Sequence, residues 1–422
     1  MALESLVVRG GIPLHGEVQI SGAKNAVLPI LAACLLTREK CVIHNAPDLS
    51  DVGFMADILR SLGAEVIVGG STLTITAKKV TGRGDYNLIR KMRGSICILG
   101  PLLGRLHKAK VSVPGGCVIG TRPINLHLKG MEALGAKVKT DSGYVIAEAK
   151  HLRGVDIFLG GRLGPTVLGT ANVMMAATLA EGRTVIESAA CEPEVVDLAN
   201  FLIAMGAKIQ GAGSPTITIN GVKELFGAEH TVIPDRIEAA TFGLAAVTTN
   251  GEVLVKGARA DHLQAVLDKL KEAGGIVEQR SGGLLFRRGK SLKSVDVATQ
   301  PYSGFPTDVQ AQMMTLMTQV NGISIITERI FEARFMHAQE LMRLGADISI
   351  EGPSAIVKGG RPLSGAPVMA SDLRASAALV IAGLVARGTT QVNRIYHLDR
   401  GYEKIDQKLR KLGARIQRRP GE

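Results

Sequence analysis

Cys117 is the residue whose setting most favours chemistry. It lies in the glycine-rich segment VPGGCVIGTRPINLH, five residues before Arg122. Neighbouring cations lower the pKa of a thiol and make it more reactive. An inert loop cysteine is the alternative, and this segment alone does not decide between the two. The other four cysteines lie in or beside apolar segments, where a thiol acts as a small hydrophobic group. They are Cys34, Cys41, Cys97 and Cys191.

Asp308 is the best candidate for a general base. It follows Pro306 and Thr307 in GFPTDVQAQMM, where a buried helix is expected to start. A carboxylate in a closed, dry cleft gains the raised basicity needed to take a proton from a sugar hydroxyl. An aspartate at a helix start is also a common N-cap, so the residue type fits both roles.

Basic residues stand at several expected helix starts. Helix N-termini attract anions, and an arginine there opposes the helix dipole, which makes a binding role more plausible than a structural one. We interpret four of these residues as a site for phosphate and carboxylate, which a guanidinium grips in bidentate fashion. They are Lys24, Arg93, Arg122 and Arg400.

Acidic residues at similar positions have a simpler explanation. Asp48, Asp51 and Asp261 are interpreted as N-caps, each worth ~1 kcal/mol. Arg236 follows Asp235 and precedes Glu238 by two residues. An internal ion pair and a ligand contact therefore both stay open for Arg236.

Composition argues against several other classes of protein. The 422 residues carry 50 Lys and Arg against 38 Asp and Glu, and this net charge of +12 suggests nucleic-acid binding. Five Tyr, nine Phe and no Trp are few for stacking bases, and the basic residues cluster only in the C-terminal KLRKLGARIQRR. No CxxC, HExxH, GxGxxG or P-loop spacing occurs. We expect no nucleic-acid partner, no metal and no cofactor.

The sequence carries no signal for export or membrane insertion. The N-terminal MALESLVVRGG lacks the basic-then-apolar layout of a signal peptide, and apolar runs such as AVLPILAACLL are too short to cross a bilayer. Five cysteines are an odd, sparse number for a disulfide framework. We expect a soluble protein of the reducing cytoplasm, with no membrane partner.

Six similar segments recur along the chain. The strings SLGAEV, ALGAKV, AMGAKI, EAGGIV, RLGADI and KLGARI are spaced 68 to 72 residues apart. Each follows an amphipathic run and precedes an alternating apolar stretch. This order predicts a helix, a left-handed glycine that ends it, and then a strand. The six glycines are Gly63, Gly135, Gly206, Gly274, Gly345 and Gly413.

Each repeat contains a second, more apolar helix upstream of the first. The six begin near KNAVLPILAACLL, RGSICILGPLLG, VLGTANVMMAATLA, RIEAATFGLAAV, DVQAQMMTLMTQV and LRASAALVIAGLVA. Because they are apolar nearly all round, we expect them to be buried inside, while the amphipathic set faces solvent on one side. A period near 70 is too long for the common solenoid repeats, so we expect a few compact domains built from several repeats each, of which three plus three is the symmetric division. A cleft between such domains is the default ligand site.

Several motifs together resemble one enzyme family. They are SGAKNA, GGCVIGTRPINLH, FPTDVQAQMM, FEARFMH, SDLRASAALV and IYHLDRGYEKI. Over the whole chain they look like the UDP-N-acetylglucosamine 1-carboxyvinyltransferases, the fosfomycin targets, which share their fold with EPSP synthase. This resemblance implies an α/β protein, a two-domain inside-out α/β barrel with six βαβαββ-type repeats, three per domain. One domain would hold residues 22–231 and the Cys117 lid loop. The other would hold residues 1–21 and 232–422, with Asp308 and Arg400.

The resemblance also implies a reaction. It is the transfer of the enolpyruvyl group from phosphoenolpyruvate to the 3-hydroxyl of UDP-N-acetylglucosamine, with release of phosphate, in the first committed step of peptidoglycan synthesis. Because the reaction passes through a tetrahedral ketal, it needs an acid at the vinyl carbon, a base at the hydroxyl and cations around the anionic substrate. Cys117 matches the lid cysteine that acts as the acid and is alkylated by fosfomycin. Asp308 matches the presumed base.

Further residues match positions that bind the two substrates. For phosphoenolpyruvate they are Lys24, Arg93, Arg122 and Arg400, of which Lys24 and Arg400 are also assigned to catalysis. For the sugar nucleotide they are Asn25, Arg93, Arg122, Pro123, Ile124, Asn125, Leu126, Thr166, Val167, Asp308 and Ile330. Segment 122–126 corresponds to the uridine pocket, and Thr166 with Val167 to the helix start that binds the diphosphate.

The chain departs from the family pattern at two places. Where the family usually reads Pro-Ser-Val-Gly-Ala-Thr, residues 165–170 read Pro-Thr-Val-Leu-Gly-Thr, so Leu168 replaces a glycine. Asn125 stands where aspartate is frequent, which adds a donor at the uracil edge. Besides a basic nucleic-acid binder, which would show salt-sensitive binding to DNA or RNA, two rival functions remain. One is EPSP synthase-type transfer to another acceptor such as shikimate 3-phosphate, against which the Cys117 segment argues. The other is a weakly catalytic paralogue that binds sugar nucleotides.

Overall fold

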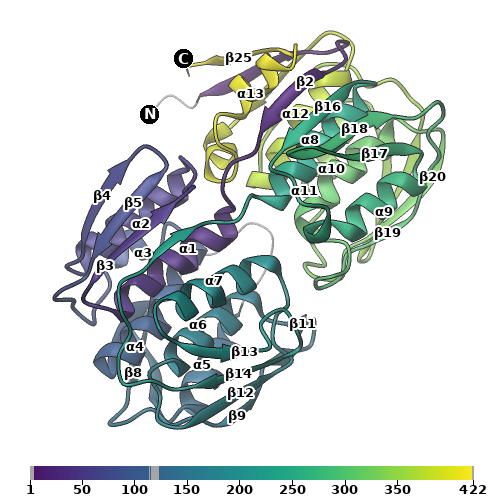
Figure 1. The fold of residues 1–422 in the computed structure, drawn as a ribbon. Coiled ribbons are helices and arrows are strands. Elements are labelled where there is room, and N and C mark those ends of the chain that lie inside the picture. Colours follow the sequence, from purple (N-terminus) through teal and green to yellow (C-terminus); the bar gives the residue numbers. More distant parts are fainter. Residues whose placement is uncertain (1–3, 114, 116–122, 421–422) are drawn as a thin grey trace. The chain divides into compact units, whose positions relative to one another are not determined.

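The computed structural model describes residues 4–113, 115 and 123–420. Two compact units make up the chain (Figure 1). One contains the described residues between Gly22 and Ile233, and the other contains those up to Ser21 and from Pro234 onward. Each unit has its own core of buried apolar side chains. We call them the 22–233 unit and the terminal unit.

The six repeats share an inner helix, a central strand, an outer helix and two further strands, and among the described residues five of them also have an edge strand. In each of the five four-stranded sheets the central strand runs parallel to this edge strand and antiparallel to its other neighbour. One complete copy consists of β9 (Asp156–Phe158), α6 (Val167–Ala177), β12 (Arg183–Glu187), α7 (Pro193–Ala204), β13 (Lys208–Gln210) and β14 (Thr216–Asn220). The expected βαβαββ repeat is confirmed.

The 22–233 unit contains two more copies. The first consists of β15 (Glu229–Thr231), α1 (Lys24–Ala33), β3 (Lys40–His44), α2 (Ser50–Ser61), β4 (Glu65–Gly69) and β5 (Thr72–Thr76). Its edge strand β15 comes from the far end of the unit. The second consists of α4 (Leu99–Leu106), β6 (Lys108–Ser112), α5 (Asn125–Ala133), β7 (Lys137–Asp141) and β8 (Tyr144–Glu148). A single parallel bridge between Arg83 and Lys110 stands where the other copies have an edge strand. Smaller elements are η1 (Cys34–Leu36), α3 (Tyr86–Ile89), η2 (Arg93–Ile98), β10 (Gly160–Gly161) and β11 (Gly164–Pro165).

The terminal unit contains the other three copies. The first consists of β2 (His15–Gln19), α8 (Arg236–Thr248), β16 (Glu252–Lys256), η3 (Ala260–His262), α9 (Gln264–Glu272), β17 (Gly275–Arg280) and β18 (Gly283–Arg288). The second consists of β19 (Val297–Ala298), α10 (Thr307–Thr318), β20 (Gly322–Thr327), α11 (Met336–Arg343), β21 (Asp347–Glu351) and β22 (Ser354–Gly359). The third consists of β23 (Pro367–Met369), α12 (Leu373–Val385), β24 (Thr389–Asn393), η4 (Ile395–Arg400), α13 (Ile405–Lys411), β25 (Arg415–Arg419) and β1 (Ser5–Arg9). The N-terminal strand β1 lies between β24 and β25 and so completes this last sheet.

The glycines that end the outer helices have the predicted conformation. All six have φ between +91° and +102°, a region that side chains other than glycine rarely adopt. They are Gly63, Gly135, Gly206, Gly274, Gly345 and Gly413. The prediction of helix, left-handed glycine and strand is therefore confirmed at every copy.

The inner helices are buried on all sides, as predicted. All thirteen residues of α8 are buried, and so are all residues from Arg374 to Leu384 in α12. Within the terminal unit α8, α10 and α12 lie together and the sheets lie outside them (Figure 1). None of the helices among the described residues is long and apolar enough to span a bilayer.

Candidate active site

Asp308 lies in the first turn of α10, between two arginines. Arg334 donates from Nη1 to Oδ1 at 2.8 Å, and Arg374 donates from Nε to Oδ2 at 3.1 Å. The N-cap position of α10 is Pro306, and no side chain caps this helix. The N-cap interpretation of Asp308 is therefore wrong, because its carboxylate is held by guanidiniums.

The two guanidiniums set the charge of Asp308. Burial alone would raise the pKa of this carboxyl, but the positive charges of Arg374 and Arg334 and their hydrogen bonds lower it well below its usual range. The sequence-based expectation that Asp308 has raised basicity is wrong, because it considered burial and left out the two arginines. Asp308 is an anion that accepts hydrogen bonds. A carboxylate with so low a pKa is a weak base toward an ordinary hydroxyl.

Arg374 offers further donors at the same place. The residue is 1% exposed, and its guanidinium lies 5.1 Å from the centre of the Tyr402 ring. Both Nη nitrogens are buried and make no hydrogen bond of good geometry among the described residues, so the Tyr402 side chain interacts with them only weakly. Unsatisfied buried donors are costly, and a bound carboxylate or phosphate would satisfy them. Arg334 and Arg374 were noticeable in the sequence as charged residues at helix starts, but we did not assign them to the site.

Asp372 and His337 lie behind these arginines. Asp372 caps α12 by accepting from the N–H groups of Arg374 and Ala375, and it lies 3.7 Å from Nη2 of Arg334. His337 is 1% exposed. Burial lowers its pKa to about 4; Asp372 opposes this shift and Arg334 adds to it. The imidazole is therefore neutral at pH 7.

Lys24 forms an ion pair with Asp51, a residue interpreted from the sequence as an N-cap. Its Nζ lies 2.7 Å from Oδ2 of Asp51, and both side chains are buried. The N-cap position of α2 is Leu49, and no side chain caps this helix. The N-cap interpretation of Asp48 and Asp51 is therefore wrong.

Asp261 does not cap a helix either. It lies inside η3, and its carboxylate forms an ion pair with Arg259 at 2.6 Å. Arg236 begins α8, whose N-cap is Asp235, and Glu238 pairs with Lys408 at 2.6 Å. The Arg236 guanidinium lies 5.3 Å from the centre of the Tyr302 ring.

Thr166 caps α6, where the diphosphate site is predicted. Its hydroxyl accepts from the N–H of Gly169 at 3.2 Å. A Cβ added at Gly169 would lie 2.4 Å from the Thr166 methyl carbon, too close without a shift. This contact accounts for the pairing of Thr166 with Gly169 at the first departure from the family pattern, and nothing in the structure explains Leu168. Threonine brings a methyl group that serine lacks, and glycine at 169 makes room for it.

The remaining predicted residues lie at the starts of other elements. In the 22–233 unit Asn25 is exposed in the first turn of α1, and Arg93 is half-buried at the start of η2. Asn125, exposed, begins α5, next to exposed Pro123 and half-buried Ile124 and Leu126. In the terminal unit Ile330 follows β20 and Arg400 ends η4, both half-buried. Cys117 and Arg122 lie outside the described residues.

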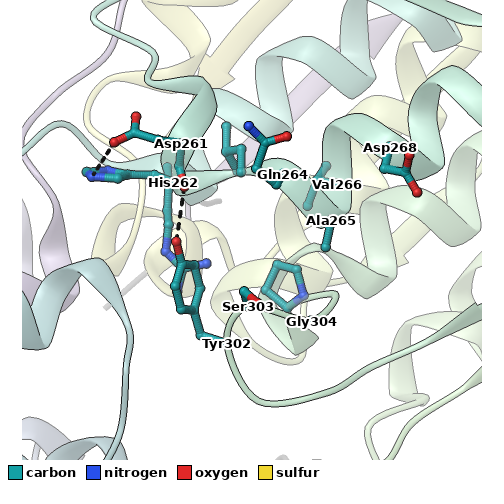
Figure 2. A pocket seen from close by; sticks show the side chains of 12 residues that line it. Asp261, His262, Gln264, Ala265, Val266, Asp268, Tyr302, Ser303 and Gly304 are labelled. Carbon is teal, nitrogen blue, oxygen red and sulfur yellow. Dashed lines mark hydrogen bonds and ion pairs between the residues drawn. The ribbon is translucent and has the colours of Figure 1, made fainter. Parts of the chain in front are cut away.

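A pocket of about 430 Å³ lies beside the start of α10 (Figure 2). Its lining includes Arg236, His262, Gln264, Tyr302 and Pro306, and Pro306 is two residues from Asp308. The Tyr302 hydroxyl donates to the backbone oxygen of Asp261 at 3.0 Å. Hydroxyl, amide, imidazole and guanidinium groups suit a polar ligand. Among the described residues, those of the pocket included, no cluster of three or more His, Cys, Asp or Glu could hold a metal ion.

Comparisons with known proteins agree with this fold. The model of the EPSP synthase (3-phosphoshikimate 1-carboxyvinyltransferase) family matches residues 8–409. Among solved structures, the enolpyruvyl transferase NikO from Streptomyces tendae superposes with a TM-score of 0.91 at 26% identity, covering 100% of both chains. An EPSP synthase from Acinetobacter baumannii gives 0.76 at 17% identity, over 99% of this chain and 100% of the other, which supports the fold alone.

Curated relatives are much more similar in sequence. A UDP-N-acetylglucosamine 1-carboxyvinyltransferase from Methylacidiphilum infernorum is 55% identical over 416 residues, 99% of each chain. A protein of the same name from Akkermansia muciniphila is 52% identical over 421 residues, also 99% of each chain. Since these matches run along nearly the whole chain, it belongs to the EPSP synthase family and, within it, to the UDP-N-acetylglucosamine 1-carboxyvinyltransferases.

Proposed function

We propose that this chain transfers the enolpyruvyl group of phosphoenolpyruvate to the 3-hydroxyl of UDP-N-acetylglucosamine and releases phosphate, in the first committed step of peptidoglycan synthesis. The observation that carries the proposal is the place of Asp308, an anionic carboxylate beside the unsatisfied Nη groups of Arg374. A hydroxyl acceptor and an anion binder side by side are what this reaction needs. The names of the full-length relatives supply the substrates.

The chemistry proceeds by addition and then elimination. In the addition, the 3-hydroxyl oxygen bonds to C2 of phosphoenolpyruvate, its proton passes to Asp308, and an acid protonates the C3 methylene. In the elimination, the C2–O bond to phosphate breaks and phosphate leaves with its electron pair, while a methyl proton returns to the conjugate base of the acid, which restores the double bond. Asp308 suits the first proton transfer, because the acidity of the hydroxyl rises sharply as its oxygen bonds to carbon.

Cys117 is our candidate for the acid, on the strength of its glycine-rich segment and the cation five residues later. The same thiol would be the group that fosfomycin alkylates. Lys24, Arg93, Arg122 and Arg400 are the proposed binding groups for phosphoenolpyruvate. Lys24 has three N–H donors, so it can hold a phosphate oxygen and remain bound to Asp51.

The sugar nucleotide takes the remaining residues. Asn25 and Ile330 are proposed to contact the sugar, and segment 122–126 the uridine. The start of α6 is proposed for the diphosphate, because the first N–H groups of a helix have no partner within the helix. The N–H of Gly169 already donates to the Thr166 hydroxyl, so the diphosphate would take the other N–H groups of this turn. We further propose that residues 22–231, with the Cys117 lid loop, and residues 1–21 and 232–422, with Asp308 and Arg400, are the two functional domains. A cytoplasmic location fits these soluble substrates.

The test compares acceptors. Purified protein is incubated with phosphoenolpyruvate and either UDP-N-acetylglucosamine or shikimate 3-phosphate, and released phosphate is measured. We expect turnover with the sugar nucleotide alone. Phosphate release only with shikimate 3-phosphate would assign the chain to the other activity of the family. Tight binding of UDP-N-acetylglucosamine without turnover would indicate the weakly catalytic paralogue.

A further inference from the structure

Glu328 is a buried acid that the proposed mechanism does not use. It follows β20 directly and is 0% exposed. Its Oε1 accepts from the Thr299 hydroxyl at 2.6 Å and from the N–H groups of Ile330 and Phe331 at 2.9 and 3.0 Å. Its Oε2 accepts from the Thr307 hydroxyl at 2.8 Å. All four partners donate, so the site requires a group that only accepts, and an ionised carboxylate is that group.

These contacts join two parts of the proposed acceptor site. Ile330 belongs to the segment proposed to contact the sugar, and Thr307 directly precedes Asp308. The Thr307 hydroxyl also accepts from Nη1 of Arg334 at 3.0 Å, and the same nitrogen donates to Asp308 at 2.8 Å. One continuous chain of hydrogen bonds therefore runs from the backbone of Ile330 through Glu328 and Thr307 to the arginine that holds the Asp308 carboxylate.

We propose that Glu328 is a positioning residue that fixes the sugar-binding segment at Ile330 relative to Asp308. The inference rests on the proposed function of these two residues. Glu328 itself has no exposed surface, so it acts through its partners rather than on the substrate. A displacement of the sugar by about 1 Å from the base can cost on the order of 100-fold in rate. The four hydrogen bonds to the buried Glu328 carboxylate hold its neighbours in place and so prevent such a displacement.

Two substitutions separate the two ends of this chain. Glu328→Gln removes the charge and replaces one of the two acceptor oxygens by an N–H₂ group that faces donors, so one end of the chain loses its acceptor and the other is held by a weaker, neutral one. Thr307→Val keeps the shape of the side chain and removes only the link toward Arg334 and Asp308. We expect Glu328→Gln to raise KM for UDP-N-acetylglucosamine roughly tenfold and to lower kcat, with KM for phosphoenolpyruvate within about twofold. Thr307→Val is expected to lower kcat with little change in either KM.

Glu340→Gln is the matched control. Glu340 also lies in the terminal unit and accepts a backbone N–H, that of Met369 at 3.0 Å, and it pairs with Arg343 rather than with the groups around Ile330, Thr307 or Asp308. Each variant is first checked for cooperative thermal unfolding, and kinetics are measured below the transition. Normal kinetics in Glu328→Gln, or equal changes in KM for both substrates, would overturn the proposal and leave Glu328 with a purely structural role. The same holds if Glu340→Gln reproduces the change.

A separate measurement distinguishes this failure from failure of the proposed function. UDP-N-acetylglucosamine binding is measured by calorimetry with wild type and Glu328→Gln. Weaker binding in the variant supports positioning of the sugar segment even if the wild type shows no turnover. Equal binding with normal turnover in both overturns the positioning role and leaves the proposed function intact.

Discussion

Arg374 donates its Nε–H to Oδ2 of Asp308 at 3.1 Å, although the two residues are 66 positions apart in the chain. The contact joins the starts of α10 and α12, two buried inner helices of the terminal unit. Together with Arg334 it keeps the Asp308 carboxylate ionised where burial alone would favour the protonated form. The chemistry proposed for Asp308 depends on this relationship.

Removing one of the two cations should change the pH dependence of the reaction. In Arg374→Gln the pKa of Asp308 moves up toward its usual range, because burial remains while one positive charge is lost. The active anionic form is then lost at a higher pH as the solution is acidified. We expect kcat/KM for the acceptor to fall on the acid side at a pH where the wild type is still level. Profiles of equal shape would contradict this explanation of the Asp308 charge.

His337 should make stability depend on pH. Its pKa is lowered by burial to about 4, whereas an unfolded histidine titrates near 6.5. Between these values the unfolded chain binds the proton and the folded chain does not, so stability falls as pH decreases from about 6.5 to about 4. Over that window the loss is of the order of 3 kcal/mol. His337→Gln should show a smaller decrease in urea unfolding free energy between the same two pH values than the wild type. The exposed control, His15→Gln, should show the same decrease as the wild type.

The contact between Gly169 and Thr166 predicts a rescue. Gly169→Ala places a methyl group against the Thr166 methyl, and we expect a loss of about 1–3 kcal/mol in stability together with weaker binding of UDP-N-acetylglucosamine. Thr166→Ser keeps the capping hydroxyl and removes the methyl, so the double variant should recover most of both losses. Urea unfolding and calorimetry measure the two effects. Additive losses in the double variant would show that the contact is not the cause.

Cys117 is tested by fosfomycin. We expect mass spectrometry to find one covalent adduct, on Cys117, formed faster when UDP-N-acetylglucosamine is bound. Cys117→Asp should retain turnover without fosfomycin sensitivity, because a carboxylic acid can also donate the proton. Cys191→Ser, at the one described cysteine that is not fully buried, serves as the control and should stay sensitive. Labelling elsewhere, or an inactive Cys117→Asp, would argue against the role of this thiol as the acid.

The repeat architecture could be predicted from the sequence because its signals are local. Gly63 and Gly413 lie at opposite ends of the chain, and each ends a helix with the same left-handed conformation. Only glycine adopts that conformation at low cost, so the residue type itself marks the boundary. The burial of the inner helices followed in the same way from residues that are apolar on every face.

The partners of the charged residues could not be predicted in this way. Asp51 was assigned as an N-cap because helix starts favour aspartate, but Lys24 lies 2.7 Å from its carboxylate. Asp308 is 26 residues from Arg334 and 66 from Arg374, and only the packed fold brings the three together. Propensity describes what a residue favours within its own helix. It contains no information about a cation that a distant segment of the chain supplies.

The most direct test of the account is the phosphate release of Asp308→Asn compared with its binding of substrate. Asparagine has nearly the same shape and can still hydrogen-bond a sugar hydroxyl, but it cannot take the proton. We predict that Asp308→Asn binds UDP-N-acetylglucosamine within about tenfold of wild type and releases phosphate from phosphoenolpyruvate on the order of 100-fold or more slowly. Turnover close to that of the wild type would contradict the assignment of Asp308 as the base.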